Sequence, residues 1–364
     1  MNKFFAFFLI KIKLKMRKNN FSRRDFLRKS VIATGSAAVL SSYTVSGDSS
    51  DQVVTVNKLP REIWITTISQ KDIGAKNSFA LIDKIFNILN ENITNYLPDI
   101  ICLPEVFPFI GIEDWDISLE EKLEISSKVL EQFSIYAKKN NCYIICPVYT
   151  SESGRIYNSA VVFDRNGNKL GEYRKIHITE GEIKDGITPG AIDPPVFQTD
   201  FGKIGIQICY DIMWNDSWKK LREKGAEIIF WPSAFPGGQM VNTKAWENMC
   251  AVVSSTWSET AKICDITGEV ISQTGKWNKN LICASVNLEK VFIHTWPSYQ
   301  RFEEIKKRYG RKIQITTFHE EQWSIIESRS PDVFIADIMK DYNLRSKNQL
   351  LQDSEMLQIK ARPK

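Results

Sequence analysis

The hydrophobic pattern of the chain from Arg61 onward alternates between two spacings. Short, nearly continuous apolar runs predict β-strands, and longer segments with apolar residues at helical spacing predict amphipathic helices. The predicted strands of the first half are residues 62–69, 99–107, 142–150, 155–164 and 167–175. The predicted helices between them are 79–97 and 119–141, and the sequence Asp-Arg-Asn-Gly at 164–167 predicts a hairpin turn.

The same order of elements returns in the second half. The predicted elements are strands at 203–211, 227–234, 250–256, 261–275 and 280–288 and helices at 216–226 and 243–249. A second hairpin turn is predicted at residues 265–268. Two rounds of β-α-β-α followed by hairpins predict an α/β protein with two sheets packed against each other and helices outside.

Residues 297–364 follow a different pattern and are predicted to form a C-terminal extension. A helix is expected at 299–310 and strands within 312–328. A second helix is expected to open at Ser330, with Pro331 in its first position. We interpret this extension as a cover or an oligomer contact.

The charge is distributed unevenly along the 364 residues, whose net charge is +5. Residues 1–30 contain ten Lys and Arg residues against one acid, Asp25, so the remainder carries a net charge of about −4. The body of the protein is therefore mildly acidic, and no nucleic-acid partner is expected.

Residues 1–45 look like a twin-arginine export signal. Arg23 and Arg24 are followed by Phe26 and Leu27 and then by a short, weakly apolar stretch. The alternative is a basic amphipathic helix. We expect residues 46–60 to be a linker, the twin-arginine export machinery to be a partner, and the protein to be exported to the periplasm or cell envelope, soluble if the signal is removed and membrane-tethered if it is not.

The seven cysteines do not indicate a metal or disulfide framework. No two of them have C-x-x-C spacing, and the chain has only three histidines. Six of the seven lie in strand-like runs, so a buried, reduced thiol is the default interpretation for each of them.

Three reactive side chains stand at the ends of predicted strands: Glu105, Lys175 and Cys209. Taken singly, each has an ordinary structural interpretation, as a solvated acid, a surface lysine and a core cysteine. Together they suit acyl transfer, because a thiol needs a base and an oxyanion needs a positive charge. Lys175 and the backbone N–H of Tyr210 could stabilise the oxyanion. His177 leaves a cysteine–histidine pair open as a less attractive alternative.

These segments resemble the carbon–nitrogen hydrolases of the nitrilase superfamily. The resemblance rests on "ICLPEVFPF", "GEYRKIHITEGE" and "GKIGIQICYD", which occur in the family's order within residues 61–296. It implies a four-layer α-β-β-α sandwich, with Glu105 as general base, Lys175 as oxyanion stabiliser and Cys209 as nucleophile. It also implies a second glutamate that orients the lysine, for which we favour Glu182 over Glu180, and a homodimer or higher homo-oligomer.

The substrate is expected to be a small amide or N-carbamoyl compound. Tyr210-Asp211 after the cysteine resembles the amidase and N-carbamoyl-amine branches rather than nitrile-cleaving ones. The expected pocket residues are Tyr210, Phe107, Trp214, Trp231 and Phe235, each of which could equally be core. No metal or cofactor is expected, since all reacting groups are side chains. Nitrile hydrolysis, N-acyl transfer and a catalytically silent binding protein remain alternatives.

Overall fold

The computed structural model describes residues 59–278 and 280–363. The predicted leader at 1–45 and nearly all of the predicted linker lie outside the described residues. In the described part of the chain, no helix is long and apolar enough to cross a membrane.

The first sheet has six strands in the order β12-β1-β2-β3-β4-β5. β1, β2 and β3 are parallel, and the other neighbours are antiparallel, so the sheet is mixed. The strands are β1 (Glu62–Ile68), β2 (Ile100–Cys102), β3 (Tyr143–Glu152), β4 (Arg155–Phe163), β5 (Lys169–Arg174) and β12 (Leu281–Asn287). Helices α2 (Ser78–Ile93) and α3 (Leu119–Asn140) connect the parallel strands.

The second sheet repeats this plan with the order β11-β10-β9-β8-β7-β6. Its parallel strands are β7, β8 and β9. The strands are β6 (Val196–Thr199), β7 (Gly202–Ile206), β8 (Ile228–Ser233), β9 (Ala251–Thr256), β10 (Lys262–Cys264) and β11 (Val270–Gln273). Helices α5 (Asp216–Glu223) and α6 (Gln239–Asn248) connect its parallel strands.

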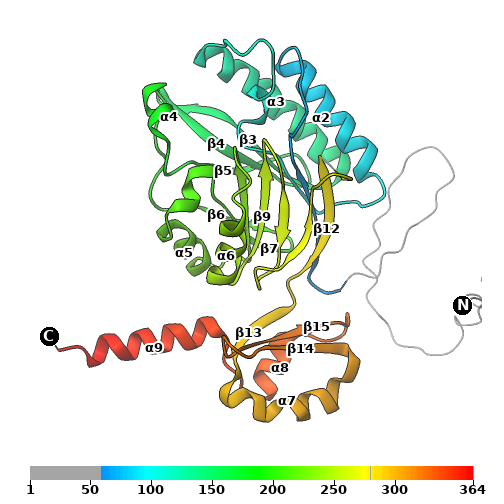
Figure 1. Ribbon diagram of the computed structural model, residues 1–364, viewed down its shortest axis with the longest axis vertical. Helices are drawn as coiled ribbons and strands as arrows, with labels where there is room; N and C mark the ends of the chain where they lie inside the picture. Colours follow the sequence, from blue (N-terminus) through cyan, green and yellow to red (C-terminus); the bar gives the residue numbers. More distant parts are fainter. Residues whose placement is uncertain (1–58, 279, 364) are drawn as a thin grey trace, which may run out of the picture. The chain divides into compact units, whose positions relative to one another are not determined.

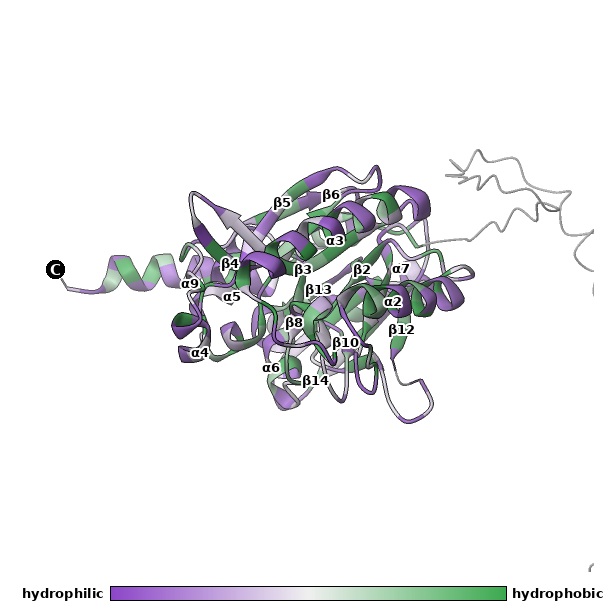
Figure 2. Ribbon diagram, turned by 90° about the horizontal axis from the view of Figure 1, so that it is seen from above, coloured by the Kyte–Doolittle hydropathy of each residue, from purple (hydrophilic) through white to green (hydrophobic). Residues whose placement is uncertain are grey.

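The two sheets pack face to face between two helix layers, which confirms the predicted α-β-β-α sandwich (Figure 1). Alternate strand residues divide between the inter-sheet core and the helix-covered cores. Ile145 faces the other sheet, for example, while its neighbours Ile144 and Cys146 pack beneath α2 and α3. Figure 2 shows the central strands as largely hydrophobic, and α2 and α3 as ribbons in which hydrophobic and hydrophilic residues alternate. Because both faces of the parallel strands are covered, their sequences are continuously apolar.

Local signals fix where the helices begin. Ser118 and Glu121 form a capping box at the start of α3, and Asn77 accepts a hydrogen bond from the N–H of Ala80 at the start of α2. The hairpin turns are confirmed: the N–H of Gly167 donates to the carbonyl of Asp164, and the N–H of Gly268 to that of Asp265.

The C-terminal extension has its own three-stranded sheet, in the order β13-β15-β14. Its elements are β13 (Lys290–His294), α7 (Thr295–Tyr309), β14 (Ile313–Phe318), β15 (Trp323–Ser328), α8 (Ile335–Asp341) and α9 (Lys347–Ala361). The predicted boundary at residues 296/297 falls inside α7. The three-stranded sheet begins earlier, at β13, because this strand already pairs with β15.

The predicted helix start at Ser330 is wrong. Residues 330–333 form a turn, closed by the N–H of Val333 donating to the carbonyl of Ser330, and α8 begins at Ile335. The N–H of Ile335 donates to the carboxylate of Glu289 at 2.6 Å. A side chain 46 positions away in sequence therefore caps this helix, which local sequence rules could not reveal.

Candidate active site

Cys209 stands at the first residue of a short 3₁₀ helix (Cys209–Met213) that follows β7. Its φ of 45° lies in the left-handed region, which is uncommon for a residue with a side chain. Asp211 holds the turn, because its buried carboxylate accepts hydrogen bonds from the N–H of Ile208 at 2.9 Å and the hydroxyl of Tyr173 at 2.7 Å. The indole N–H of Trp231 also donates to the carbonyl of Cys209 at 3.0 Å. The surrounding core therefore maintains the strained backbone that presents the thiol.

Glu105 and Lys175 meet next to this turn. Nζ of Lys175 lies 2.8 Å from Oε1 of Glu105, and the two side chains are 2% and 3% exposed. Glu105 follows β2 and Lys175 follows β5, so strands of the same sheet bring them together. The indole N–H of Trp257 donates to the carbonyl of Glu105 and holds the loop that carries it.

Glu182 completes the charged group from the short helix α4 (Glu180–Lys184). Its carboxylate lies 2.9 Å from Nζ of Lys175 and also accepts the N–H and hydroxyl of Thr179. Glu180 is exposed. The structure therefore places Glu182, rather than Glu180, beside the lysine.

Asn158 joins the two carboxylates. Its Nδ2 donates to Oε1 of Glu105 and to Oε1 of Glu182, both at 2.8 Å. Together with Lys175, this amide fixes the orientation of both acids.

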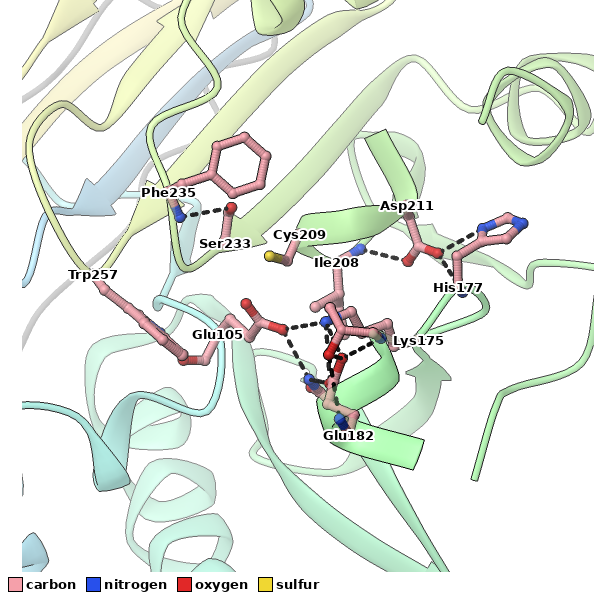
Figure 3. Close-up of polar contacts among 12 residues, drawn as sticks. Glu105, Lys175, His177, Glu182, Ile208, Cys209, Asp211, Ser233, Phe235 and Trp257 are labelled. Carbon is pink, nitrogen blue, oxygen red and sulfur yellow. Dashed lines mark hydrogen bonds and ion pairs between the residues drawn. The ribbon is translucent and has the colours of Figure 1, made fainter. Parts of the chain in front are cut away.

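One oxygen of Glu105 remains unused within this network. Oε2 is buried and has no hydrogen-bond partner among the described residues. Figure 3 shows that the unbonded oxygen points to the side on which the thiol of Cys209 lies. Burying a carboxylate oxygen without a hydrogen-bond partner costs free energy. The direction of this oxygen toward the thiol therefore indicates that it accepts a proton or a hydrogen bond from a ligand.

The electrostatics of the group follow from burial and charge. Burial raises the pKa of Cys209 to about 12, and Glu105 adds to this, while Lys175 and hydrogen bonds from the Ala234 N–H and the Ser233 hydroxyl oppose it. Burial alone would lower the pKa of Lys175, but Glu105, Cys209 and Glu182 outweigh it and raise the pKa above its ordinary value. The cluster of Glu105, Lys175, Glu182 and Cys209 therefore holds a protonated thiol close to a fixed ammonium ion.

Two of the five predicted pocket residues lie in hydrophobic cores. Phe107 and Trp231 are fully buried, and the expectation that their side chains line a pocket is wrong. Phe107 packs edge-on against Phe133 of α3 in the helix-covered core. Trp231 belongs to the core beneath α6 and acts through its hydrogen bond to Cys209.

The other three predicted pocket residues are partly exposed. Phe235 is half-buried and packs edge-on against Trp231, and its N–H donates to Ser233, beside the thiol (Figure 3). Trp214 stacks on His177 with ring centroids 4.1 Å apart, and Tyr210 contacts Trp214 edge-on. Figure 3 places His177 beyond Asp211, away from the thiol, so this aromatic stack lies to the side of the cluster.

Sequence reasoning did not single out Asn158, Asp211 or Trp257 as site residues. Asn158 lies in the predicted strand 155–164, and Asp211 lies in the segment "GKIGIQICYD". A polar residue inside an apolar strand pattern was the available signal for Asn158. Trp257 carried no signal, since only the fold places its indole beside Glu105.

All seven cysteines are free; six of them are buried, whereas Cys283, for which a buried thiol was also expected, is half-buried. Within the described ranges, no group of three or more His, Cys, Asp or Glu side chains is placed to hold a metal ion.

Comparison with known proteins identifies the class to which this fold and site belong. Residues 80–292, more than half of the chain, match the model of the carbon–nitrogen hydrolase family, and the chain belongs to this family. Its catalogued relatives include a deaminated glutathione amidase from Synechocystis, 27% identical over 224 residues that cover 53% of this chain and 81% of the relative. They also include N-carbamoylputrescine amidase from Arabidopsis thaliana, 25% identical over 236 residues that cover 55% and 71% of the two chains.

Solved structures share the fold. A carbon–nitrogen hydrolase from Helicobacter pylori superposes with a TM-score of 0.55 and 20% identity, over 69% of this chain and 94% of that one. An amidase from Nesterenkonia superposes with a TM-score of 0.54 and 16% identity, over 62% and 90% of the two chains.

Proposed function

We propose that this protein hydrolyses the C–N bond of a small amide or N-carbamoyl compound through a thioester on Cys209. The observation that carries the proposal is the unpaired Oε2 of Glu105, held on the thiol side of a cluster in which the other carboxylate oxygens all accept hydrogen bonds. The names of the amidase and carbamoylputrescine amidase relatives support an amide or carbamoyl group over a nitrile.

The first half of the reaction forms the thioester. Sγ of Cys209 attacks the carbonyl carbon while Oε2 of Glu105 takes the thiol proton, which gives a tetrahedral oxyanion. The ammonium group of Lys175 and the N–H of Tyr210, in the first turn of the 3₁₀ helix, stabilise that oxyanion. Glu105 then gives its proton to the leaving nitrogen, and ammonia or an amine departs.

The second half reverses these proton movements. Glu105 removes a proton from water, and the hydroxide attacks the thioester carbonyl. The collapse of the second tetrahedral intermediate breaks the C–S bond, and the proton returns to sulfur. Glu182 and Asn158 contribute by holding Lys175 and Glu105 in place, since both contact these residues directly.

The decisive experiment measures ammonia release from a panel of linear amides, N-carbamoyl amino acids and nitriles, together with intact-mass detection of an acyl adduct. We expect Cys209→Ala to abolish both signals, and Glu105→Gln to lower turnover by about 10²–10⁴-fold. Cys283→Ala is a matched control, because Cys283 is half-buried in β12 and outside the cluster. Turnover or adduct that survives in the Cys209→Ala variant would refute the proposal.

A further inference from the structure

Tyr149 lies beside the charged cluster but takes no part in its hydrogen bonds. In the antiparallel pairing of β3 with β4, Tyr149 is directly opposite Asn158. Residues opposite each other share one face of the sheet, so its side chain lies on the same face as the amide that joins Glu105 and Glu182. This is the face that continues into the inter-sheet core through Ile145.

The ring of Tyr149 is held from two sides. The ring centroid of Phe109 lies 5.6 Å away, and Nζ of Lys122, from the first turn of α3, lies 6.0 Å from the centroid of the Tyr149 ring. Neither contact involves the hydroxyl. The orientation of the ring is therefore fixed without using its polar atom.

The hydroxyl of Tyr149 has no hydrogen-bond partner among the described residues. A tyrosine hydroxyl this close to a core normally finds a partner. Tyr149 is half-buried, and its oxygen is not one of the fully buried unpartnered atoms, so solvent or a ligand can reach it.

The charges around this hydroxyl keep it protonated. Burial raises the pKa of Tyr149 above its ordinary value, and the carboxylates of Glu182 and Glu105 add to the effect and outweigh the opposing charge of Lys175. Both oxygens of Glu182 already accept hydrogen bonds from Asn158, Lys175 and Thr179. Oε2 of Glu105 and Oδ1 of Asn158 are buried and have no partner among the described residues, so the hydroxyl of Tyr149 donates to neither. The hydroxyl is thus a free donor beside the network.

We infer that Tyr149 is a substrate-binding residue whose hydroxyl donates a hydrogen bond to an oxygen acceptor on the substrate, beyond the scissile C–N bond. The inference rests on the proposed function and narrows its substrate class to amides or carbamoyl compounds that carry such an oxygen. Lys122 has no carboxylate partner among the described residues, so a carboxylate oxygen could be bound by both side chains, and a hydroxyl or carbonyl oxygen by Tyr149 alone.

The test compares Tyr149→Phe, which removes only the hydroxyl, with wild type on three matched probes. These are succinamate with a carboxylate, 4-hydroxybutyramide with a neutral oxygen, and butyramide with neither. A lost hydrogen bond is worth about tenfold in binding, so we expect Tyr149→Phe to lower kcat/KM about tenfold on at least one oxygen-bearing probe, through KM. The kcat/KM of Tyr149→Phe on butyramide should differ from that of wild type by less than about twofold. Lys122→Gln distinguishes a carboxylate from a neutral oxygen acceptor, since it should lower kcat/KM on succinamate alone.

Tyr157→Phe is the matched control. Tyr157 lies one residue from Asn158 on the opposite face of β4, with its ring against the guanidinium of Arg174. Equal kinetics of Tyr149→Phe and wild type on all three probes would overturn the inference, and so would an equal loss on all three, which would mean a role in the chemistry itself.

Binding to the Cys209→Ala variant, measured by calorimetry with the same probes, keeps the test independent of turnover. Tighter binding of an oxygen-bearing probe that disappears in the Cys209→Ala/Tyr149→Phe double variant supports the inference even if turnover is slow. Absence of any preference over butyramide contradicts it. Failure of the proposed function is distinguishable, because wild type would then form no acyl adduct with any amide.

Discussion

The ammonium group of Lys175 lies 2.8 Å from a carboxylate oxygen of Glu105 inside a region that solvent barely reaches. Two charges buried in this way are stable only if their remaining hydrogen-bonding positions are also satisfied. Glu182 and Asn158 supply those contacts, but they leave one oxygen of Glu105 open. The arrangement thus combines a rigid charge pair with one available proton acceptor.

Glu182 should stabilise the protein at neutral pH. Burial opposes its ionisation, but Lys175 and the N–H of Thr179 outweigh burial and lower the pKa of the carboxyl. Because the folded-state pKa is below the unfolded one, the stabilisation is present above the unfolded pKa of about 4.3 and is lost as the pH falls through the folded value. We expect Glu182→Gln to lower the free energy of unfolding by about 1–3 kcal/mol at pH 7, and by less at pH 3.5.

Urea unfolding of wild type and variant at the two pH values checks this prediction. Glu180→Gln is the control, because Glu180 lies in the same helix and is exposed. A difference between Glu182→Gln and wild type that grows on acidification would contradict the expected sign.

Cys209 should be alkylated slowly at neutral pH. Burial raises the pKa of its thiol to about 12, and the thiolate is the form that reacts with iodoacetamide. The rate should therefore rise about tenfold per pH unit from pH 7 to 10, whereas a free thiol with a pKa of about 8.5 approaches its plateau in that range. Peptide mass spectrometry follows the modification, with glutathione as the reference. A plateau below pH 9 would show that the resting thiol ionises more readily than its burial implies.

Asp211→Asn should disturb the turn that carries Cys209. The carboxylate is fully buried and accepts hydrogen bonds from Ile208, Tyr173 and the N–H of His177. An amide nitrogen at one of these positions would face a donor, so we expect a loss of stability of about 2 kcal/mol or more. Alkylation of Cys209 at a fixed pH should change as well, because the left-handed backbone at residue 209 loses a support.

Chemical denaturation and the alkylation assay measure the two effects of Asp211→Asn. Asp216→Asn is the control, since Asp216 is exposed at the start of α5. A variant with wild-type stability and thiol reactivity would contradict the role assigned to Asp211.

Lys347 should attach α9 to the rest of the protein. Its Nζ lies 4.6 Å from the ring of Trp323, and 5.2 Å from the rings of Trp246 and Phe292. Cation–π contacts of this kind contribute about 0.5–2 kcal/mol, so Lys347→Gln should increase the proteolysis rate of α9 and lower the unfolding midpoint. Lys360→Gln, on an exposed residue of the same helix, should change neither. Equal proteolysis of the two variants would contradict this assignment.

The sequence by itself determined the elements and the three strand-end residues. Continuous apolar runs predicted the parallel strands, because such strands are buried on both faces, and the repeated order of elements predicted two sheets. Glu105, Lys175 and Cys209 stood out because each ends a predicted strand and because their segments resemble the carbon–nitrogen hydrolases in the family's order. Phe107 and Trp231 could not be assigned in this way, because an aromatic residue near a motif can face either a core or a pocket.

Only the tertiary structure decided which groups far apart in the sequence contact each other, and which of their polar atoms have hydrogen-bond partners. It placed Glu182, which the sequence already favoured over Glu180, beside Lys175. It also brought Asn158 and Trp257 to Glu105 and left Tyr149 with a free hydroxyl. It also returned β12 to the edge of the first sheet, although this strand follows those of the second. The physical reason is that hydrogen-bond partners and burial depend on side chains far apart in the sequence, whereas hydrophobic periodicity depends only on residues that are close together in the sequence.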